Sequence, residues 1–289
     1  MDRETLDVLL SKPERIAAFD ARLVDRLRAL IGTGSAALVE VAGRDSVAAA
    51  IAAARSGAYD ILVPTVVYTG TEFGDWEVVL ENARSLHSRL GDMDSIRITE
   101  GPVILGSPRW WHVSAGRYSG ALLKRYGFSP TCIACHMYLH AARLPFALEV
   151  GARSIVSGER LRHDDRVKLN QLGAVLDSYS TVIEAEGLTL DLPLEEVSDG
   201  ALVEDLVGQW PESERQMSCV LESNYRDAEG DREGAIVVCG RRGDQAAVVG
   251  DLDGDTGEEA TAGYHDAGAN RTFNWIQITA GGDVESGGG

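Results

Sequence analysis

Lysine is scarce in this sequence of 289 residues, and its scarcity shapes the charge of the whole chain. The three lysines stand at positions 12, 124 and 168, so arginine supplies most of the 27 basic residues that oppose 45 acidic ones. A net charge of −18 is typical of proteins that stay in solution at high salt. It also disfavours a nucleic-acid partner, because such binding depends on lysine and arginine contacts to phosphate.

Long apolar runs and an export signal are also absent. No stretch approaches the roughly 20 apolar residues that cross a bilayer, and residues 1–19 lack a basic segment followed by an apolar one. Only four cysteines are present, and two of them form a Cys-x-x-Cys motif. That number is too small for a disulfide scaffold and suits a reducing compartment, so we expect a cytoplasmic protein with no membrane partner.

Strands and helices are predicted to alternate along most of the chain. The predicted strands are the apolar runs at 36–41, 60–68, 95–101 and 152–158. The predicted helices cover 13–31, 47–57, 75–91 and 133–150. Near-continuous apolar strands between helices are typical of a parallel sheet covered on both faces, which places the fold in the α/β class.

The sequence divides into four predicted parts. Residues 1–35 form an N-terminal helical segment, 36–222 the α/β domain, 223–280 a small antiparallel β appendage, and 281–289 a disordered tail. The boundary near residue 222 is a change to short strand-like runs between Gly/Asp-rich turns. The glycine-rich composition of the tail disfavours a packed structure.

The first predicted strand ends in a turn, from Ala42 to Ser46, that opens directly into an alanine-rich helix. Such a turn, here with Gly43, points backbone N–H groups and the positive end of the helix at one spot, which favours an anion. Arg44 or Ser46 can also reach a phosphate there. The alternative is an ordinary strand-to-helix turn in which Asp45 caps the helix.

In this region the sequence resembles the PP-loop ATP pyrophosphatases, whose first strand ends in Ser-Gly-Gly-x-Asp-Ser. Residues 43–46 match the last four positions, whereas Val41 and Ala42 replace the first serine and glycine. The loss of one hydroxyl and one glycine changes how pyrophosphate is held, although Ala42 is small and backbone donors need no side chain. The resemblance implies that Ala42, Gly43, Arg44, Asp45 and Ser46 bind ATP, with Mg²⁺ held by Asp45.

Residues 132–171 extend the resemblance to the sulfur-inserting branch of this family. In that branch a Cys-x-x-Cys opens a helix, and the next strand ends in a Gly-His-x-x-Asp-Asp-like loop that faces the nucleotide. This chain has the cysteine pair, then a strand that ends at Gly158, then Asp164 and Asp165 two residues later than in the family. Glu159 and Arg160 replace the usual histidine, and the lysine that follows the second cysteine in the branch is missing.

The resemblance assigns roles in this second region. Gly158, Arg160 and Asp165 would border the nucleotide, and Asp164 or Asp165 would join Asp45 as an oxygen ligand of Mg²⁺. Tyr68 and Thr69, at the end of the second strand, would border the adenine, unless the segment at 69–77 is only a surface loop.

Three cysteines in the order Cys132, Cys135 and Cys219 resemble the cluster ligands of the iron-sulfur-dependent tRNA thiolases of this family. The resemblance implies a [4Fe-4S] cluster held by three thiolates, with one iron open to sulfide. A structural zinc (Zn²⁺) site that uses Cys132, Cys135 and two later ligands is the competing interpretation, because zinc accepts mixtures of cysteine and histidine. A c-type haem also matches the motif, but the missing export signal disfavours it. Cys239 lies in an apolar run and is interpreted as a core residue.

Residues around the Cys-x-x-Cys motif carry weaker signals. His136 and His140 lie one helical turn apart and are either supports of the site or exposed helix residues. Trp110 and Trp111 either stack on a substrate or pack into the core, and packing is the favoured interpretation.

The resemblance therefore implies an ATP-dependent sulfur transferase. A substrate carbonyl attacks the α-phosphate, pyrophosphate leaves, and sulfide or a persulfide on Cys132 or Cys135 displaces AMP. The expected partners are tRNA or a small-molecule substrate, a sulfur donor, and a second copy of the chain in a homodimer. Two other functions stay open: a non-catalytic adenine-nucleotide-binding protein with structural zinc, and an ATP-independent iron-sulfur desulfurase.

Overall fold

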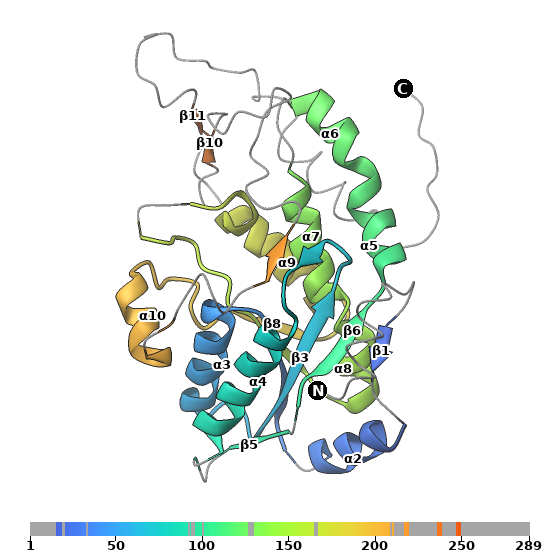
Figure 1. Cartoon of the computed structure of the whole chain (residues 1–289), viewed down its shortest axis with the longest axis vertical. Coiled ribbons are helices and arrows are strands. Elements are labelled where there is room, and N and C mark those ends of the chain that lie inside the picture. Colours follow the sequence, from blue (N-terminus) through green and yellow to red (C-terminus); the bar gives the residue numbers. More distant parts are fainter. Residues whose placement is uncertain are drawn as a thin grey trace.

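A mostly parallel β-sheet with helices on both faces forms the centre of the structure, so the predicted α/β class is confirmed (Figure 1). The structure is a computed structural model. It describes residues 16–18, 21–32, 34–91, 93, 96–99, 101–126, 130–164, 167–208, 210, 217–219, 236–238 and 247–249.

Within these residues the main sheet has seven strands, in the order β1-β6-β3-β2-β7-β8 with β5 paired to β3. Their bounds are β1 (Ile16–Ala18), β2 (Ala36–Glu40), β3 (Ile61–Tyr68), β5 (Arg97–Ile98), β6 (Val103–Gly106), β7 (Ser154–Val156) and β8 (Thr189–Asp191). In the middle of the sheet Ala37 of β2 lies opposite Leu62 of β3 and Ser154 of β7. All of these pairings are parallel except that of β1 with β6.

The strand order reverses beside β2. The chain runs outward from β2 to β3 and β6, and then returns to β7 and β8 on the other side of β2. Ligands of open α/β sheets collect at such a reversal, outside the carboxyl ends of the strands. The loops that follow β2 and β7 therefore lie where a ligand is expected.

Two groups of helices cover the two faces of the sheet. The helix bounds are α2 (Ala21–Ile31), α3 (Arg44–Ser56), α4 (Glu77–Leu90), α5 (Pro108–Ser114), α6 (Ser119–Tyr126), α7 (Thr131–Ala141), α8 (Leu144–Val150), α9 (Gly173–Ala185) and α10 (Gly200–Val207). Short 3₁₀ helices are η1 (Gly116–Tyr118) and η2 (Leu169–Gln171). Helices α3, α4 and α10 share one apolar core, and α2, α7, α8 and α9 share the other (Figure 1).

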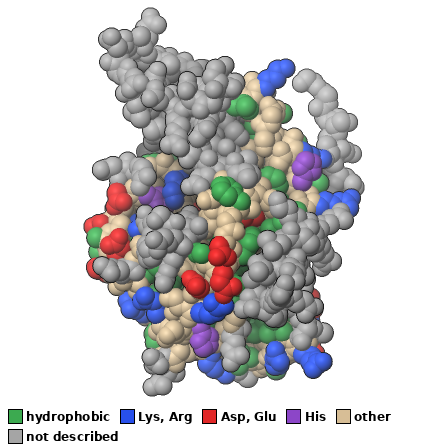
Figure 2. Space-filling model, in the orientation of Figure 1, with side chains coloured by type: hydrophobic (Ala, Val, Ile, Leu, Met, Phe, Trp, Pro, Cys, Tyr) green, Lys and Arg blue, Asp and Glu red, His purple; other side chains and the backbone are tan. Residues whose placement is uncertain are grey.

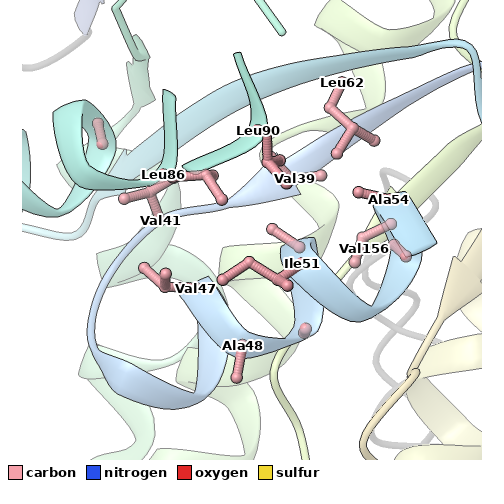
Figure 3. Close-up of a cluster of buried hydrophobic side chains, with 14 of the residues drawn as sticks. Val39, Val41, Val47, Ala48, Ile51, Ala54, Leu62, Leu86, Leu90 and Val156 are labelled. Atoms are coloured by element: carbon pink, nitrogen blue, oxygen red, sulfur yellow. The ribbon is translucent and has the colours of Figure 1, made fainter. Parts of the chain in front are cut away.

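The alternation of side chains along β2 explains why there are two cores. Val39 joins the core under α3, whereas Leu38 joins the core on the opposite face. The small alanines of α3 let this helix lie close to the sheet, and Val47 and Ile51 extend from it toward β2 and β3 (Figure 3). Burial of each such valine or isoleucine contributes about 1.5–3 kcal/mol, so this packing holds the start of α3 against the end of β2.

Three sequence predictions about these elements were wrong in extent. The N-terminal helix begins at Ala21 and not at residue 13, because Ile16–Ala18 pairs with β6 as an edge strand. The strand expected at 95–101 shrinks to the two residues of β5, and the unpredicted β6 pairs with the end of β3. The helix expected from 133 to 150 is split into α7 and α8, since Pro145 lacks an N–H for a continuous ladder.

The N-terminal residues pack into the main domain. Leu27 and Ile31 of α2 share a core with Phe146 and Ala147 of α8. Beyond residue 219 the structure describes the antiparallel strands β10 (Ile236–Val238) and β11 (Ala247–Val249), and the predicted tail lies outside the described residues. No helix in the described part of the chain is both long and apolar enough to cross a membrane.

Candidate functional site

The turn after β2 is fixed by hydrogen bonds from its own residues and from α4. The Ala42 N–H donates to Ser46 Oγ at 2.9 Å, and Ser46 Oγ donates to the Gly43 carbonyl at 2.8 Å. From α4, the buried Asn82 donates its Nδ2 to the Ala42 carbonyl at 2.8 Å. The Ser46 hydroxyl is thus used inside the turn, which gives the turn a defined shape.

Helix α3 begins at Arg44 with Gly43 at its N-cap, and within the described structure no side chain caps it. The alternative interpretation of Asp45 as the helix cap was therefore wrong. The Asp45 carboxylate instead accepts from Arg44 Nε at 3.1 Å and from Arg160 Nε at 3.1 Å. The first turn of α3 directs its backbone N–H groups and positive dipole end toward the edge of the sheet.

The loop after β7 packs directly on this turn. A Cβ atom added to Gly158 would lie 2.5 Å from the carbonyl carbon of Asp45 and 2.5 Å from the nitrogen of Ser46. No side chain fits between backbones at that distance, so glycine is required here for close approach. The structure thus brings Gly158 and the 43–46 turn together at the switch point of the sheet.

Arg160 joins the two loops from inside the protein. Its side chain is completely buried, and it donates to Asp45, to the Val197 carbonyl at 3.2 Å and to His163 Nδ1 at 2.8 Å. Burial, aided by the positive charge of Lys168, lowers the pKa of His163 to about 4, which leaves the ring neutral and able to accept from Arg160. Arg160 therefore acts in the described structure as a buried clamp on Asp45.

A buried ionic network surrounds Glu159, the next residue after the glycine. His136 Nδ1 lies 2.6 Å from Glu159 Oε1, His140 Nε2 lies 3.4 Å from the same oxygen, and Gln171 donates to the other oxygen. Burial alone would raise the pKa of Glu159, but the charges and hydrogen bonds of His136 and His140 hold it well below its usual value. Burial lowers the pKa of His136, and the Glu159 charge raises it by more.

Replacing Glu159 with glutamine is expected to lower the free energy of unfolding by about 1–3 kcal/mol near pH 6, because two imidazoles lose their anionic partner. The depressed pKa of Glu159 gives stability that is present above its unfolded pKa of about 4.3 and is lost as the pH falls through the folded value. The raised pKa of His136 gives stability that is present below about pH 6.5 and is lost as the pH rises through its folded value.

The loss caused by Glu159→Gln should therefore be largest between about pH 4.5 and 6.5 and smaller at about pH 9. Urea unfolding at these pH values measures it, with the exposed Glu184→Gln as the matched control. An equal loss at both pH values would show that the network does not depend on ionised partners.

The two carboxylates predicted to share Mg²⁺ have different partners. Asp164 has a positive φ of 55°, and its Oδ1 accepts from the Gly200 N–H at 2.8 Å, at the start of α10. Asp45 is held by its two arginines. Asp165 lies outside the described residues. The described carboxylates thus do not form a ready metal site between the two loops.

The three predicted cysteines gather at the same edge of the sheet. Cys132 and Cys135 lie in the first turns of α7, and Cys219 lies in β9 (Ser218–Cys219), opposite Glu72 of β4 (Glu72–Phe73). Burial raises the pKa of Cys132 to about 11, with a contribution from the nearby Cys219. Burial also raises the pKa of Cys135, and the charges of Cys132, Cys219 and Glu72 add to it against a hydrogen bond from Trp111.

The arrangement of these thiols does not fit a metal cluster. The Trp111 Nε1–H donates to Cys135 Sγ at 3.2 Å, and Cys219 Sγ lies 3.3 Å from the Thr71 hydroxyl. Across the described ranges, no group of three or more His, Cys, Asp or Glu side chains is placed to hold a metal ion. The iron-sulfur cluster and the zinc expected from the sequence stay predictions. Cys239 lies outside the described residues.

The aromatic residues near this edge serve mainly as packing. Trp110 makes an edge-to-face contact with Tyr138 at 5.4 Å, which agrees with the favoured interpretation of core packing. Tyr68, predicted to border the adenine, is 2% exposed and contacts Trp76. Within the described part of the chain, the Tyr68 hydroxyl has no hydrogen-bond partner. It is therefore a buried polar group that a ligand can satisfy.

Sequence reasoning missed several residues of this edge. Glu159 was noted only as a departure from the family, although a carboxylate directly after a strand-ending glycine is a usable signal for a site. His136 and His140 were left between two interpretations. His140 is completely buried, and His136, although partly exposed, contacts Glu159, so both have a supporting role. Thr71 and Glu72 carried no pattern, because only the return of Cys219 places them beside a thiol.

Comparison with known proteins gives one informative relative. The archaeon Methanocaldococcus jannaschii has a protein described as "Uncharacterized protein MJ0009", which is 36% identical to this chain over 205 residues. The match covers 69% of this chain and 74% of that protein. No family model matches the chain.

Proposed function

We propose, from the premise that this chain belongs to the same family as the archaeal protein MJ0009, that it is an ATP-pyrophosphatase-type enzyme of the PP-loop fold. Its reaction would adenylylate a carbonyl group and replace the oxygen with sulfur. One observation carries the proposal: the turn at 43–46 and the loop at Gly158 touch at the switch point, on the same sheet edge as three cysteines.

The residues of the turn supply what adenylylation requires. Backbone N–H groups at the start of α3 and the guanidinium of Arg44 can bind the phosphates of MgATP. The substrate carbonyl oxygen then forms a bond to the α-phosphorus as the bond to pyrophosphate breaks. Fixed N–H groups and arginine stabilise the negative charge that develops in this step. Arg160 holds Asp45, and with it the first turn of α3, in place.

The contacts of Asp45 favour a second function, the binding of adenine nucleotide without catalysis. Asp45 already accepts from two guanidinium groups, so its oxygens are not free for a metal ion in the described arrangement. A chain that binds adenine nucleotide without turnover would show this arrangement. The two functions differ in pyrophosphate release.

Pyrophosphate release from MgATP in the presence of unfractionated archaeal tRNA and sulfide tests the proposal. Release that depends on the added tRNA is expected for the wild-type chain, and Asp45→Asn is expected to reduce it by about 100-fold or more, because the arginines lose their anionic partner beside the phosphates. Arg162→Met, at an exposed position of the loop after β7, is the control. Tight MgATP binding without pyrophosphate, with tRNA or a small carbonyl substrate, would favour the non-catalytic function.

The net charge of the chain separates the two proposed substrate classes, RNA and a small carbonyl compound, by how their binding depends on salt. The whole chain carries −18, and the face drawn in Figure 2 has acidic side chains next to basic ones over the described residues. An RNA substrate would therefore bind through local arginines and weaken steeply with salt. A small carbonyl compound carries no such dependence, so the effect of salt on pyrophosphate release separates the two substrates.

A further inference from the structure

The turn after β3 connects a carboxylate to the Cys219 thiol through two hydroxyl groups. Thr69 Oγ1 donates to Glu72 Oε1 at 2.6 Å and lies 2.7 Å from Thr71 Oγ1. Thr71 Oγ1 lies 3.3 Å from Cys219 Sγ, within the limit for a sulfur hydrogen bond. Both threonines are buried. The path from carboxylate to thiol is therefore continuous, and its two hydroxyl groups are shielded from bulk water, whereas Glu72 and Cys219 at its ends are partly exposed.

The direction of each hydrogen bond in this path follows from the number of protons available. The Glu72 carboxylate only accepts, and it also accepts from the N–H groups of Thr69 and Gly70, each at 2.9 Å. Thr69 has one hydroxyl proton, which it gives to Glu72, so Thr71 must donate to Thr69. Thr71 then has only lone pairs to offer to Cys219. The thiol is thus the donor at the far end of the path.

We propose that Thr69 and Thr71 form a proton relay through which Glu72 acts as the base for a nucleophilic Cys219. As the sulfur forms a bond to an electrophilic carbon, the leaving group departs with the electrons of its bond. The thiol proton passes to Thr71, the Thr71 proton passes to Thr69, and the Thr69 proton passes to Glu72. The products are a thioether or thioester-like carbon, a released leaving group and a neutral glutamic acid. No metal or oxidant takes part.

A separate observation, a hydroxyl beside the turn that is buried and unpartnered in the described structure, points to a ligand. The buried Tyr68 hydroxyl, which has no partner in the described part of the chain, lies within about 4 Å of the position of a Cβ on Gly70. A buried hydroxyl without a partner costs about 1–3 kcal/mol, so a polar ligand group beside the turn would relieve that cost. The ligand class is thus a polar molecule whose electrophilic carbon reaches Cys219 while an acceptor meets Tyr68.

Among the described residues, the titratable side chains that interact with Cys219 or Glu72 include Cys132 and Cys135 of α7 and Tyr68 at the end of β3. Glu72 itself lies opposite Cys219 on β4. The proposed function would supply a fitting electrophile, since an adenylylated carbon carries AMP as its leaving group. In that one respect the inference depends on the proposed function, whereas the relay does not depend on ATP.

The relay is tested by the rate at which iodoacetamide alkylates Cys219 in the full chain, without metal or nucleotide. Peptide mass spectrometry follows Cys219, and added glutathione serves as the reference thiol. Thr71→Val is expected to slow alkylation of Cys219 by about tenfold or more at pH 7, because it removes the bridging hydroxyl and keeps the charge of Glu72. Thr71→Ser should retain the wild-type rate. The difference should vanish at high pH, where the thiolate forms without a base.

Two further variants keep the test decisive. Thr69→Val cuts the same path at its other hydroxyl and should slow the reaction as Thr71→Val does, which covers the case in which Thr71→Val fails to fold. Glu72→Gln should also slow alkylation, because the base is lost. If Glu72 acted only as a nearby negative charge, Glu72→Gln would raise the thiolate fraction and speed alkylation, and that result would overturn the relay.

A Thr71→Val rate equal to the wild-type rate at pH 7 would also overturn it. The result of the alkylation experiment does not depend on whether the proposed ATP reaction takes place. If the relay variants behave as expected and MgATP gives no pyrophosphate, the thiol site stands and the ATP reaction fails. If pyrophosphate is released and the alkylation rates are unchanged, the ATP reaction stands and the relay fails.

Discussion

The Arg160→Met variant should lose about 3–5 kcal/mol of its free energy of unfolding, the typical cost of breaking a buried ion pair by removing one partner. Arg160 is completely buried and bonds to Asp45, the Val197 carbonyl and His163. Methionine fills similar space but donates no hydrogen bond, so these three groups lose the donor that Arg160 supplies. Urea unfolding measures the loss.

Two controls separate this effect from a change in net charge. Arg162→Met removes the same charge from an exposed position two residues away and should change stability by no more than about 0.5 kcal/mol. The double variant that combines Arg160→Met with Asp45→Asn should lose less free energy of unfolding than the sum of the two single variants. Equal losses for Arg160→Met and Arg162→Met would contradict the clamp.

The Gly158→Ala variant is expected to be destabilised by about 3 kcal/mol, at the upper end for overpacking, and to lose MgATP binding. The added methyl would lie 2.5 Å from backbone atoms of Asp45 and Ser46, which cannot rotate away as a side chain can. The loop after β7 must therefore move off the turn at the start of α3. Thermal unfolding and calorimetric titration with MgATP measure the two effects.

Gly120→Ala is the matched control for this substitution. Among the described residues, no atom outside its chain neighbours and the backbone of its own helix lies within 4 Å of a Cβ built on Gly120, and the residue lies in α6, where alanine is the better helix former. The control should be neutral or slightly stabilised. If Gly158→Ala behaves in the same way and still binds MgATP, the contact between the two loops is not needed for the site.

The order of elements around the site was readable from the sequence, whereas their extent was not. Apolar runs that end in glycine predicted the strand before Gly43 and the strand before Gly158, because each pattern depends on residues close together in the chain. β1 and β6 were missed or misread, since three or four apolar residues have no distinctive period and their pairing joins residues about 90 positions apart.

The partners of the site residues depend on contacts that no local pattern encodes. Asp45 matches a motif, but its arginine partner at position 160 comes from a loop on the far side of β2. The relay to Cys219 requires β9 to pair with β4, across 147 positions of sequence between Glu72 and Cys219. The motif residues were thus predictable, and the groups that orient them were not.

The most direct test of the central claim is a structure of the wild-type chain with Mg²⁺ and an ATP analogue that cannot release pyrophosphate. We expect the triphosphate to lie at the first turn of α3, against the backbone of residues 43–46, with Arg44 at the phosphates and Gly158 still in contact with the turn. A nucleotide bound at another edge of the sheet, or with its phosphates away from α3, would contradict it.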